Sequence, residues 1–329
     1  MNTASATPGG GTLLAIDWGT SSLRGALLDA QGRLLGERGS AQGILSVPAG
    51  GFAAVFEAQF GDWARSGVRL CLIAGMAGSK QGWLEAPYCA CPAGFADIAA
   101  QLAWVDSAAL PLPVAIVPGL SCTHASPAFP DAGLPDVMRG EETQVIGALQ
   151  LTGVQDGVFV LPGTHSKWVT VQGGRITGFK TYMSGEFYAL LTRHSLLAKS
   201  VAPDAPFEGT AFAAGVTQAR SGAGLLHNAF GTRTLSLFGR MDAPALSSYL
   251  SGLVIGEELR AQATGAAQEV VLIGAPALLH PYTQALAMHG IGCRALGGEA
   301  TWAGLHALAN TLDGSTSPQG RTPLLQSKT

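Results

Sequence analysis

Charge is scarce in this chain of 329 residues. Lysine, arginine, aspartate and glutamate together make up 12% of the sequence, and the net charge at pH 7 is −3. A nucleic-acid-binding surface requires lysines and arginines gathered on one face, and an acidic interaction tail requires a run of acids. The composition offers neither pattern, so it argues against nucleic acid as a partner.

Cysteine is also sparse, and long apolar runs are missing. The five cysteines are scattered, and the one close pair, Cys89 and Cys91, lacks a second pair or a nearby histidine to complete a zinc site. No run approaches the roughly 20 apolar residues of a membrane span, and residues 1–11 lack the basic start and apolar segment of a signal peptide. We therefore expect reduced cysteines, no membrane association and a cytoplasmic protein, with a disordered leader at 1–11 and a polar tail at 313–329.

Chain length, in contrast, is ample. The sequence is long for one hydrophobic core and sufficient for two domains of ordinary size. We therefore expect a cleft between two domains, and the functional residues are sought in segments that could face it.

Residues 13–28 form an apolar run that is interrupted by one acid and a Gly-Thr-Ser turn. The pattern predicts a β-hairpin that binds phosphate. Gly19 can adopt positive φ and lets backbone N–H groups approach an anion, and hydroxyl donors follow at Thr20, Ser21 and Ser22. Asp17 ends a buried strand beside this turn, which suits a Mg²⁺ ion that keeps most of its waters. The alternative interpretation is a capped turn with a solvated aspartate.

Residues 157–171 repeat this hairpin. Three positions of the new turn, Gly163, Thr164 and Ser166, correspond to Gly19, Thr20 and Ser22. Two such turns, one opening each half of the chain, indicate an internal duplication that could hold one phosphate chain from both sides. The copies differ in chemistry, because Leu161 replaces Asp17 and the second turn adds two candidate phosphate ligands, His165 and Lys167. Each of these two could equally be an ordinary turn or strand residue.

The segments between the hairpins alternate between strand and helix. We expect a third antiparallel strand at 33–37, a helix at 51–66 and a buried strand at 70–74. A glycine-rich loop follows at 75–83, where open α/β sheets usually bind ligands. Its candidate substrate contacts are Gly75, Met76, Ala77, Gly78 and Lys80. A loop without function is the alternative.

The segment 136–149 begins with a glycine and two acids and then becomes an apolar-periodic helix. Glu141 and Glu142 could be first-turn charges that the helix dipole favours by up to about 1 kcal/mol each. Alternatively, one of them faces a cleft and serves as the base for a substrate hydroxyl. Arg139, directly before them, is a candidate cation for a substrate carboxylate.

The last part of the chain is mostly helical. Helices are predicted at 182–199, 211–219 and 244–263, followed by a buried strand that starts at residue 269. This strand breaks at Gly274, Ala275 and Pro276, where small residues would let a base or ribose approach the backbone. A small-residue helix near 300–309 closes the fold.

These pieces occur in the order typical of the sugar-kinase, heat-shock-70 and actin superfamily, which the chain resembles. More closely, it is similar to the 2-dehydro-3-deoxygalactonokinase family in residues 15–21 (AIDWGTS), 138–144 (MRGEETQ) and 162–168 (PGTHSKW). The resemblance implies an α/β fold of two actin-like (ribonuclease H-like) domains, each opening with a β-meander. We place them at 12–154 and 155–298, with a closing helix at 299–312 that packs back at the hinge.

The resemblance also implies an enzyme that phosphorylates the terminal hydroxyl of 2-dehydro-3-deoxy-D-galactonate with ATP and Mg²⁺. Asp17 would lie on the metal side, and Glu141 or Glu142 would accept the hydroxyl proton. Many relatives have an aspartate at the start of this helix, whereas this chain has Gly140, Glu141 and Glu142. The substrate carboxylate calls for a cation, for which the candidates are Arg24, Lys80 and Arg139.

Two other functions stay open. One is a kinase for a different sugar acid, a neutral sugar or a polyol, and the other is a nucleotide-switched ATPase that acts on a protein partner. The expected partner is a small sugar acid, with a homodimer left open as the assembly.

Overall fold

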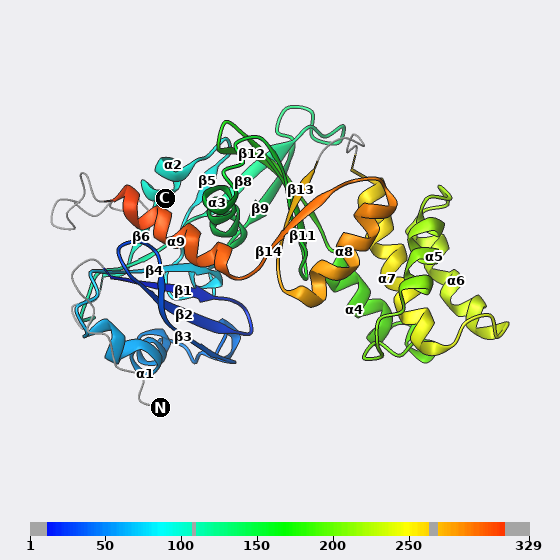
Figure 1. Cartoon of the computed structure of the whole chain (residues 1–329), viewed down its shortest axis with the longest axis horizontal. Coiled ribbons are helices and arrows are strands. Elements are labelled where there is room, and N and C mark those ends of the chain that lie inside the picture. The colour runs from blue at the N-terminus through cyan, green and yellow to red at the C-terminus, as the bar shows by residue number, and fades with distance from the viewer. Residues whose placement is uncertain (1–11, 107–109, 263–268, 313–329) are drawn as a thin grey trace. The chain divides into compact units, whose positions relative to one another are not determined.

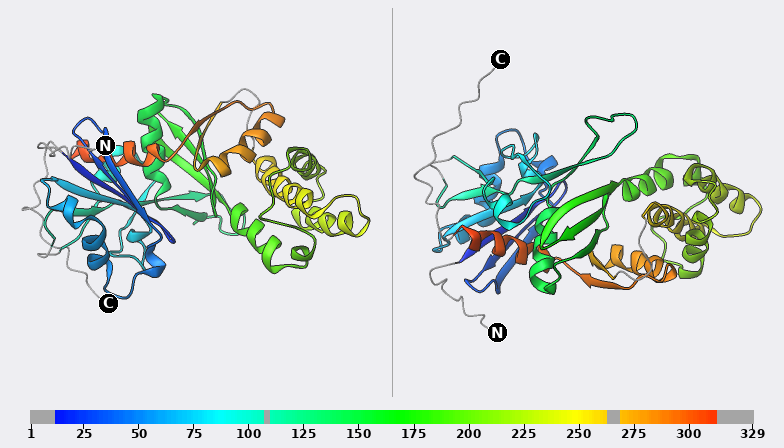
Figure 2. Two further views of the ribbon diagram at one scale, coloured as in Figure 1. Left: turned by 60° about the horizontal axis from the view of Figure 1, so that its bottom comes forward. Right: turned by 90° about the horizontal axis from the view of Figure 1, so that it is seen from above.

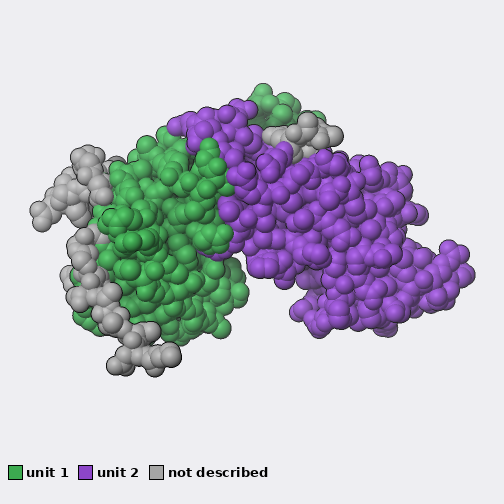
Figure 3. Space-filling view, viewed as in Figure 1, with its two compact units in different colours: residues 1–153, 299–329 green, residues 154–298 purple. Residues whose placement is uncertain are grey.

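A computed structural model describes residues 12–106, 110–262 and 269–312 of the chain. By their contacts, the residues divide into two compact units (Figure 3): Met1–Gly153 with Glu299–Thr329, called unit 1, and Val154–Gly298, called unit 2. The predicted leader at 1–11 and tail at 313–329 lie outside the described residues. Among the described helices, none is long and apolar enough to cross a membrane.

Unit 1 is built on a six-stranded sheet with the order β3-β2-β1-β4-β7-β6, of which Figure 1 labels β1 to β4 and β6. The first three strands form an antiparallel meander, while β4 and β7 continue the sheet in parallel and β6 ends it in antiparallel. Strands β1 and β4 are almost wholly buried, as their near-continuous apolar sequences predict. The strands are β1 Leu13–Trp18, β2 Leu23–Leu28, β3 Leu34–Ser40, β4 Leu70–Gly75, β6 Ala103–Trp104 and β7 Val114–Ile116.

Helix α1 (Phe52–Ala64) packs its aromatic face onto this sheet. A Cβ at Gly25 of β2 would overlap the ring of Phe60, so the absence of a side chain there lets the helix approach the strand. A second, three-stranded sheet and short helical segments complete this part of the unit. They are β5 Tyr88–Ala90, β8 Gly119–His124, β9 Leu134–Met138, α2 Phe95–Ala99, η1 Ile44–Ser46 and η2 Met76–Gly78.

Helices α3 (Glu141–Thr152) and α9 (Glu299–Thr311) cross closely within unit 1 (Figure 1). A Cβ at Gly147 would overlap the carbonyl oxygen of Ala300, and one at Gly304 would overlap that of Thr143. Glycine at both positions therefore allows backbone-to-backbone packing.

Unit 2 contains a five-stranded sheet with the order β12-β11-β10-β13-β14. Strands β10, β11 and β12 form an antiparallel meander, and β13 and β14 follow in parallel. This order and these directions match those of β3-β2-β1-β4-β7, as the predicted duplication requires. The strands are β10 Gly157–Leu161, β11 Ser166–Gln172, β12 Arg175–Tyr182, β13 Val270–Ile273 and β14 Cys293–Leu296.

Helices make up the rest of unit 2 (Figure 2). Helices α5 and α7 lie side by side, because a Cβ at Gly215 would overlap the carbonyl oxygen of Tyr249 and one at Gly252 would overlap that of Phe212. The helical segments are α4 Ser184–His194, η3 Leu196–Lys199, α5 Gly209–Ala219, α6 Leu225–Leu237, α7 Ala243–Arg260 and α8 Pro276–Met288.

The α/β fold class and both meanders are confirmed, with two differences in detail. The helix predicted at 182–199 is interrupted at Ser195, whose backbone is extended and whose hydroxyl accepts a hydrogen bond from the backbone N–H of Leu197 at 3.0 Å. The sequence analysis also did not predict helix α6, strand β14 or the three-stranded sheet. These elements are short or have mixed polarity, so apolar periodicity does not mark them.

Candidate active site

Asp17 and Arg24 face each other across the first hairpin, at the end of β1 and the start of β2. The Arg24 Nη2 lies 2.6 Å from the Asp17 Oδ2, and the two side chains are 38% and 21% exposed, respectively. The Arg24 guanidinium also lies over the ring of Trp302 in α9, with 5.6 Å to the ring centroid. The carboxylate is therefore oriented by a cation while it stays accessible to solvent.

The turn between these strands exposes its hydroxyl groups. The backbone N–H of Gly19 donates to the carbonyl of Ser22 at 2.9 Å, and the carbonyls of Gly19 and Thr20 accept hydrogen bonds from the N–H groups of Ile44 and Leu45. The turn is thus attached to η1 by its backbone. The exposed residues of the turn are the three predicted phosphate ligands, Thr20, Ser21 and Ser22.

Gly75 links the carboxyl ends of β1 and β4 to the start of α3. It has a φ of +92°, and a Cβ there would lie 2.9 Å from the carbonyl oxygen of Trp18 and 3.3 Å from the Asp17 Oδ1. On its other side lies Gly140, with φ +105°, whose Cβ would be 3.3 Å from the Gly75 Cα. The two glycines bring the acidic start of α3 near the carboxylate of Asp17.

The predicted substrate contacts in the loop after β4 differ in exposure. Ala77 and Gly78 are buried, Met76 is half-buried and Lys80 is exposed. A Cβ at Gly78 would lie 2.7 Å from the Arg139 Nη1, so this glycine makes room for the guanidinium.

Arg139 directly follows β9, and its guanidinium has no acidic partner among the described residues. The Nη2 donates to the carbonyl of Ala86 at 2.9 Å, and the guanidinium stacks on the ring of Tyr88 at 4.4 Å. Its Nε and Nη1 are buried without a hydrogen-bond partner. A buried cation in this condition is costly, which makes it a candidate receptor for an anion.

The two acids at the start of α3 differ in their surroundings. Glu142 is fully buried, and its carboxylate accepts hydrogen bonds from the Gly140 N–H at 2.7 Å and the Thr143 hydroxyl at 3.0 Å. Burial, with the nearby charge of Glu141 as a further cause, raises the pKa of Glu142 to about 8. Glu141 is half-buried, and its Oε2 accepts from the Arg139 N–H at 3.0 Å. At pH 7 a carboxyl with this pKa is mostly protonated, which makes Glu142 the weaker candidate for the base.

In unit 2, the second hairpin turn is held by the first turn of α4. A Cβ at Gly185 would overlap the carbonyl of Gly163, and the Glu186 N–H donates to the carbonyl of Thr164 at 2.9 Å. The His165 Nε2 lies 2.6 Å from the Glu186 Oε2. Thr164 and His165 are exposed, so this part of the turn is open to a ligand.

The next two predicted phosphate ligands point into unit 2. Ser166 is fully buried, and its hydroxyl donates to the Glu258 Oε1 at 2.8 Å. Lys167 is 5% exposed, and its Nζ donates to the Thr181 Oγ1 at 2.8 Å. Both side chains therefore have partners within the protein.

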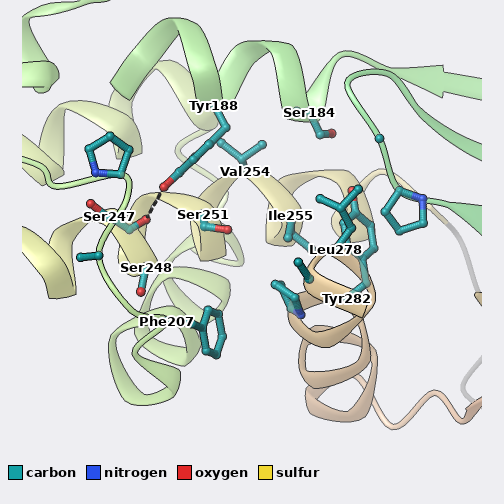
Figure 4. Close-up of a pocket in the computed structure, with 17 residues that line it drawn as sticks. Ser184, Tyr188, Phe207, Ser247, Ser248, Ser251, Val254, Ile255, Leu278 and Tyr282 are labelled. Carbon is teal, nitrogen blue, oxygen red and sulfur yellow. Dashed lines mark hydrogen bonds between the residues drawn. The ribbon is translucent and has the colours of Figure 1, made fainter. Parts of the chain in front are cut away.

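The predicted adenosine loop, Gly274 to Pro276, leads from β13 into α8. A Cβ at Gly274 would lie 3.7 Å from the carbonyl oxygen of Pro162, so this loop borders the second hairpin turn. A pocket of about 400 Å³ opens between α4, α7 and α8 (Figure 4), and Gly163, Ala277 and Leu278 are among the residues that line it. All the side chains that line it are neutral, and several carry hydroxyl groups. Such a pocket suits a flat, uncharged group better than a charged one.

Comparison with known proteins identifies the relatives of this chain. The sequence profile of the 2-keto-3-deoxy-galactonokinase family matches residues 17–308. The chain belongs to the 2-keto-3-deoxy-galactonokinase family. It is 35% identical to a probable 2-dehydro-3-deoxygalactonokinase of Rhizobium meliloti (strain 1021), over 92% of this chain and 98% of the relative. It is 33% identical to the 2-dehydro-3-deoxygalactonokinase of Escherichia coli (strain K12), over 91% and 98% of the two chains.

A solved structure agrees with this 2-keto-3-deoxy-galactonokinase assignment. It is a crystal structure of a protein from Sinorhizobium meliloti, provisionally described as a 2-dehydro-3-deoxygalactonokinase, with 34% identity and a TM-score of 0.81. The similarity covers 92% of this chain and all of the other. The predicted family resemblance is confirmed.

Several residues of the unit 2 pocket in this 2-keto-3-deoxy-galactonokinase family member are not visible in the sequence. They include Ser184, Tyr188, Phe207, Ser248 and Tyr282, together with Glu258, which accepts hydrogen bonds from two of them. Most lie within helices, where only tertiary packing decides which side chains face a pocket. Glu258 directly follows another acid, Glu257, which gives no local sign that one of the two is buried.

Proposed function

We propose that this protein transfers the terminal phosphoryl group of ATP to the 6-hydroxyl of 2-dehydro-3-deoxy-D-galactonate, giving 2-dehydro-3-deoxy-6-phosphogalactonate. Family membership supports the reaction class. The observation that carries the proposal is the guanidinium of Arg139, whose Nε and Nη1 are buried without a hydrogen-bond partner. The backbone N–H of the same residue donates to the candidate base Glu141. A substrate with a carboxylate at one end and a reactive hydroxyl at the other matches a cation and a base on one segment.

In the transfer step, the 6-hydroxyl oxygen forms a bond to the γ-phosphorus, and the bond from that phosphorus to the bridging oxygen of ADP breaks. Glu141 accepts the hydroxyl proton, because Glu142 is mostly protonated at neutral pH. The transition state is loose, so alignment and neutralisation of charge contribute most of the rate enhancement.

Asp17 is the residue that we propose to hold a metal ion. Its Oδ2 is paired with Arg24, and its carboxylate borders the exposed hydroxyls of the first turn. Among the described residues, no group of three or more histidine, cysteine or acidic side chains could hold a metal by itself. A single carboxylate suits Mg²⁺, which keeps several waters, binds with substrate phosphates and would supply charge neutralisation there.

Each unit has its own proposed nucleotide contacts. In unit 1 the Thr20–Ser22 hydroxyls, and in unit 2 the turn at 163–165 with its exposed Thr164 and His165, are the proposed phosphate ligands. The neutral pocket beside Ala275 and Pro276 is the proposed site of the adenosine group. For Ser166 and Lys167 the proposal is limited to their backbone, because their side chains have other partners.

The direct test is a coupled ADP-release assay across 3-deoxy-2-keto acids, aldonates, hexoses and polyols. We expect release that depends on 2-dehydro-3-deoxygalactonate. Turnover with a hexose or polyol instead would favour a neutral-sugar kinase, and ATP turnover that ignores every small acceptor would favour a nucleotide-switched ATPase.

Arg139→Gln tests the proposed carboxylate contact. The variant should raise the KM for the sugar acid at least about tenfold, since a charge-assisted hydrogen bond contributes about 1.5–3 kcal/mol. Lys80→Gln is the matched control, because Lys80 is exposed. If only Lys80→Gln raised the KM, the carboxylate assignment would move to Lys80. The cytoplasmic location and the homodimer stay predictions.

A further inference from the structure

Glu258 is a buried acid that the proposed reaction does not use. It lies near the end of α7, and only 2% of its surface is exposed. Glutamate is almost never fully buried unless its carboxylate is paired, because removing the charge from water costs several kcal/mol. Its partners therefore show what the side chain does.

The Glu258 carboxylate accepts four hydrogen bonds, all from neutral groups. Its Oε1 accepts from the Ser166 hydroxyl at 2.8 Å and the Trp168 indole N–H at 2.5 Å. Its Oε2 accepts from the Tyr282 hydroxyl at 2.8 Å and from the Ser184 hydroxyl. A carboxylate has about four lone-pair sites, so these donors saturate it.

This arrangement suits the ionised carboxylate. Burial raises the pKa of Glu258 above its ordinary value, and the hydrogen bonds from Ser184, Trp168, Ser166 and Tyr282 offset part of that rise. An indole N–H can only donate, and each hydroxyl has a single proton to give. With all four protons directed to Glu258, the hydroxyl oxygens have only lone pairs left for any other partner.

The four donors come from three segments that surround the proposed nucleotide site. Ser166 begins β11 directly after the second hairpin turn, and Ser184 begins α4, whose next residue packs on that turn. Tyr282 belongs to α8, which starts at the end of the predicted adenosine loop. Ser184 and Tyr282 also line the pocket (Figure 4). One side chain thus connects the wall of the pocket to the base of the turn.

We propose that Glu258 is a positioning residue for the nucleotide: it fixes the second hairpin, α4 and α8 at the spacing the nucleotide needs, and it turns the Ser184 and Tyr282 hydroxyls into acceptors toward the pocket. Acceptors there suit ligand groups that donate hydrogen bonds, such as ribose hydroxyls or an exocyclic amine. The inference rests on the assignment of this pocket to the nucleotide.

Glu258→Gln tests this role while keeping the length of the side chain. The indole N–H of Trp168 can only donate, so the single oxygen of the new amide stays beside it. The amide NH₂ then faces the hydroxyls of Ser184 and Tyr282. Those hydroxyls must then accept from the amide and point their protons toward the pocket. We expect the Kd for ADP, measured by calorimetry, to rise at least about tenfold, while the KM for the sugar acid stays within about twofold.

Glu257→Gln is the matched control, with the same substitution at the preceding residue of α7. Glu257 pairs with Arg260 instead of contacting the pocket. Its Kd for ADP should equal that of the unaltered protein. If the unaltered protein bound no ADP, the proposed function itself would fail. If it bound ADP and Glu258→Gln bound equally well, only the role of Glu258 would be refuted.

Tyr282→Phe keeps the test decisive if Glu258→Gln does not fold. The phenyl ring preserves packing and removes one donor from the Oε2. We expect a Kd for ADP that is raised about threefold or more, with the KM for the sugar acid unchanged. An unchanged Kd, or an equal rise in both constants, would mean that the network serves stability alone.

Discussion

The two hairpins share a topology but place their polar groups in opposite directions. In the first hairpin, Asp17 faces Arg24, and both are accessible to solvent. In the second, the corresponding pair is Leu161 and Lys167, and both are buried. The serines differ likewise, because Ser22 is exposed whereas Ser166 is buried against Glu258.

The two hairpins therefore have different proposed roles, although their topology is the same. The first hairpin has a solvent-accessible ion pair and exposed hydroxyls, as a site for phosphate and metal requires. The second hairpin is attached from behind by Glu258 and by the start of α4, and it leaves only the tip of its turn open. We infer that the first copy supplies reactive charge and the second supplies a rigid support.

Removing the acid of the first hairpin should have the largest effect. Asp17→Ala should abolish transfer, with kcat reduced at least about 10³-fold, because charge stabilisation at the reacting phosphate is lost. The thermal midpoint should change little, since a partly exposed ion pair contributes only about 0–1 kcal/mol. Asp29→Asn, which alters the exposed Asp29–Arg33 pair of the following turn, is the control. A variant at Asp17 with most of its activity would end the assignment of reactive charge to this hairpin.

Substituting the candidate base should have the next largest effect. Glu141→Gln should lower kcat by roughly 10²–10⁴-fold, the usual contribution of a general base. Glu142→Gln should lower kcat less than tenfold, because the buried acid is already neutral at pH 7. The base assignment fails if both variants turn over within about threefold of the unaltered enzyme, and it moves to Glu142 if the order is reversed.

Placing an acid in the second hairpin should affect stability instead of chemistry. Leu161 is 3% exposed, so Leu161→Asp buries a carboxylate without a built partner and should destabilise the fold by about 3 kcal/mol or more. Leu161→Asn has the same shape without the charge and should be less damaging at pH 7. Urea denaturation measures both. Equal stability of Leu161→Asp and the unaltered protein would show that the second hairpin tolerates the chemistry of the first.

The last prediction concerns the buried acid of unit 1 and the pH dependence of stability. The pKa of Glu142 is raised from 4.5 to about 8 in the folded chain, mainly by burial. Between these values the unfolded chain has already lost the proton that the folded chain keeps, so folding stability should fall as pH rises from 5 to 8. Glu142→Gln should remove this part of the slope in urea midpoints measured across that range. Parallel pH profiles for the two proteins would refute the shift.

The sequence predicts those parts of the fold whose signals are local. Glycine, threonine and serine between apolar runs mark both hairpins, and the buried strands β4 and β13 are continuous apolar runs. The acids before α3 were also located, but their division into a half-buried Glu141 and a buried Glu142 depends on the packing of the whole unit. Residues next to each other in sequence can thus differ in burial.

The support behind the second hairpin could not be predicted, because it depends on residues far apart in the chain. Glu258 is more than 70 positions from Ser166 and Ser184, and the helix pattern around it does not mark it as buried. Ser166 and Lys167 look like turn ligands in sequence, but the side of the strand they occupy is decided by α7 and β12. Chemistry at a turn is visible in sequence, whereas the packing that orients it is not.

The closing helix α9 has a consequence for the order in which the protein can be completed. It comes last among the described elements, yet it packs on α3 and on strands β1 and β4, which belong to the first half of the chain. During synthesis, the face of unit 1 that α9 covers therefore stays exposed to solvent until all of unit 2 has been made. The ribosome must deliver nearly the entire chain before its first domain can close.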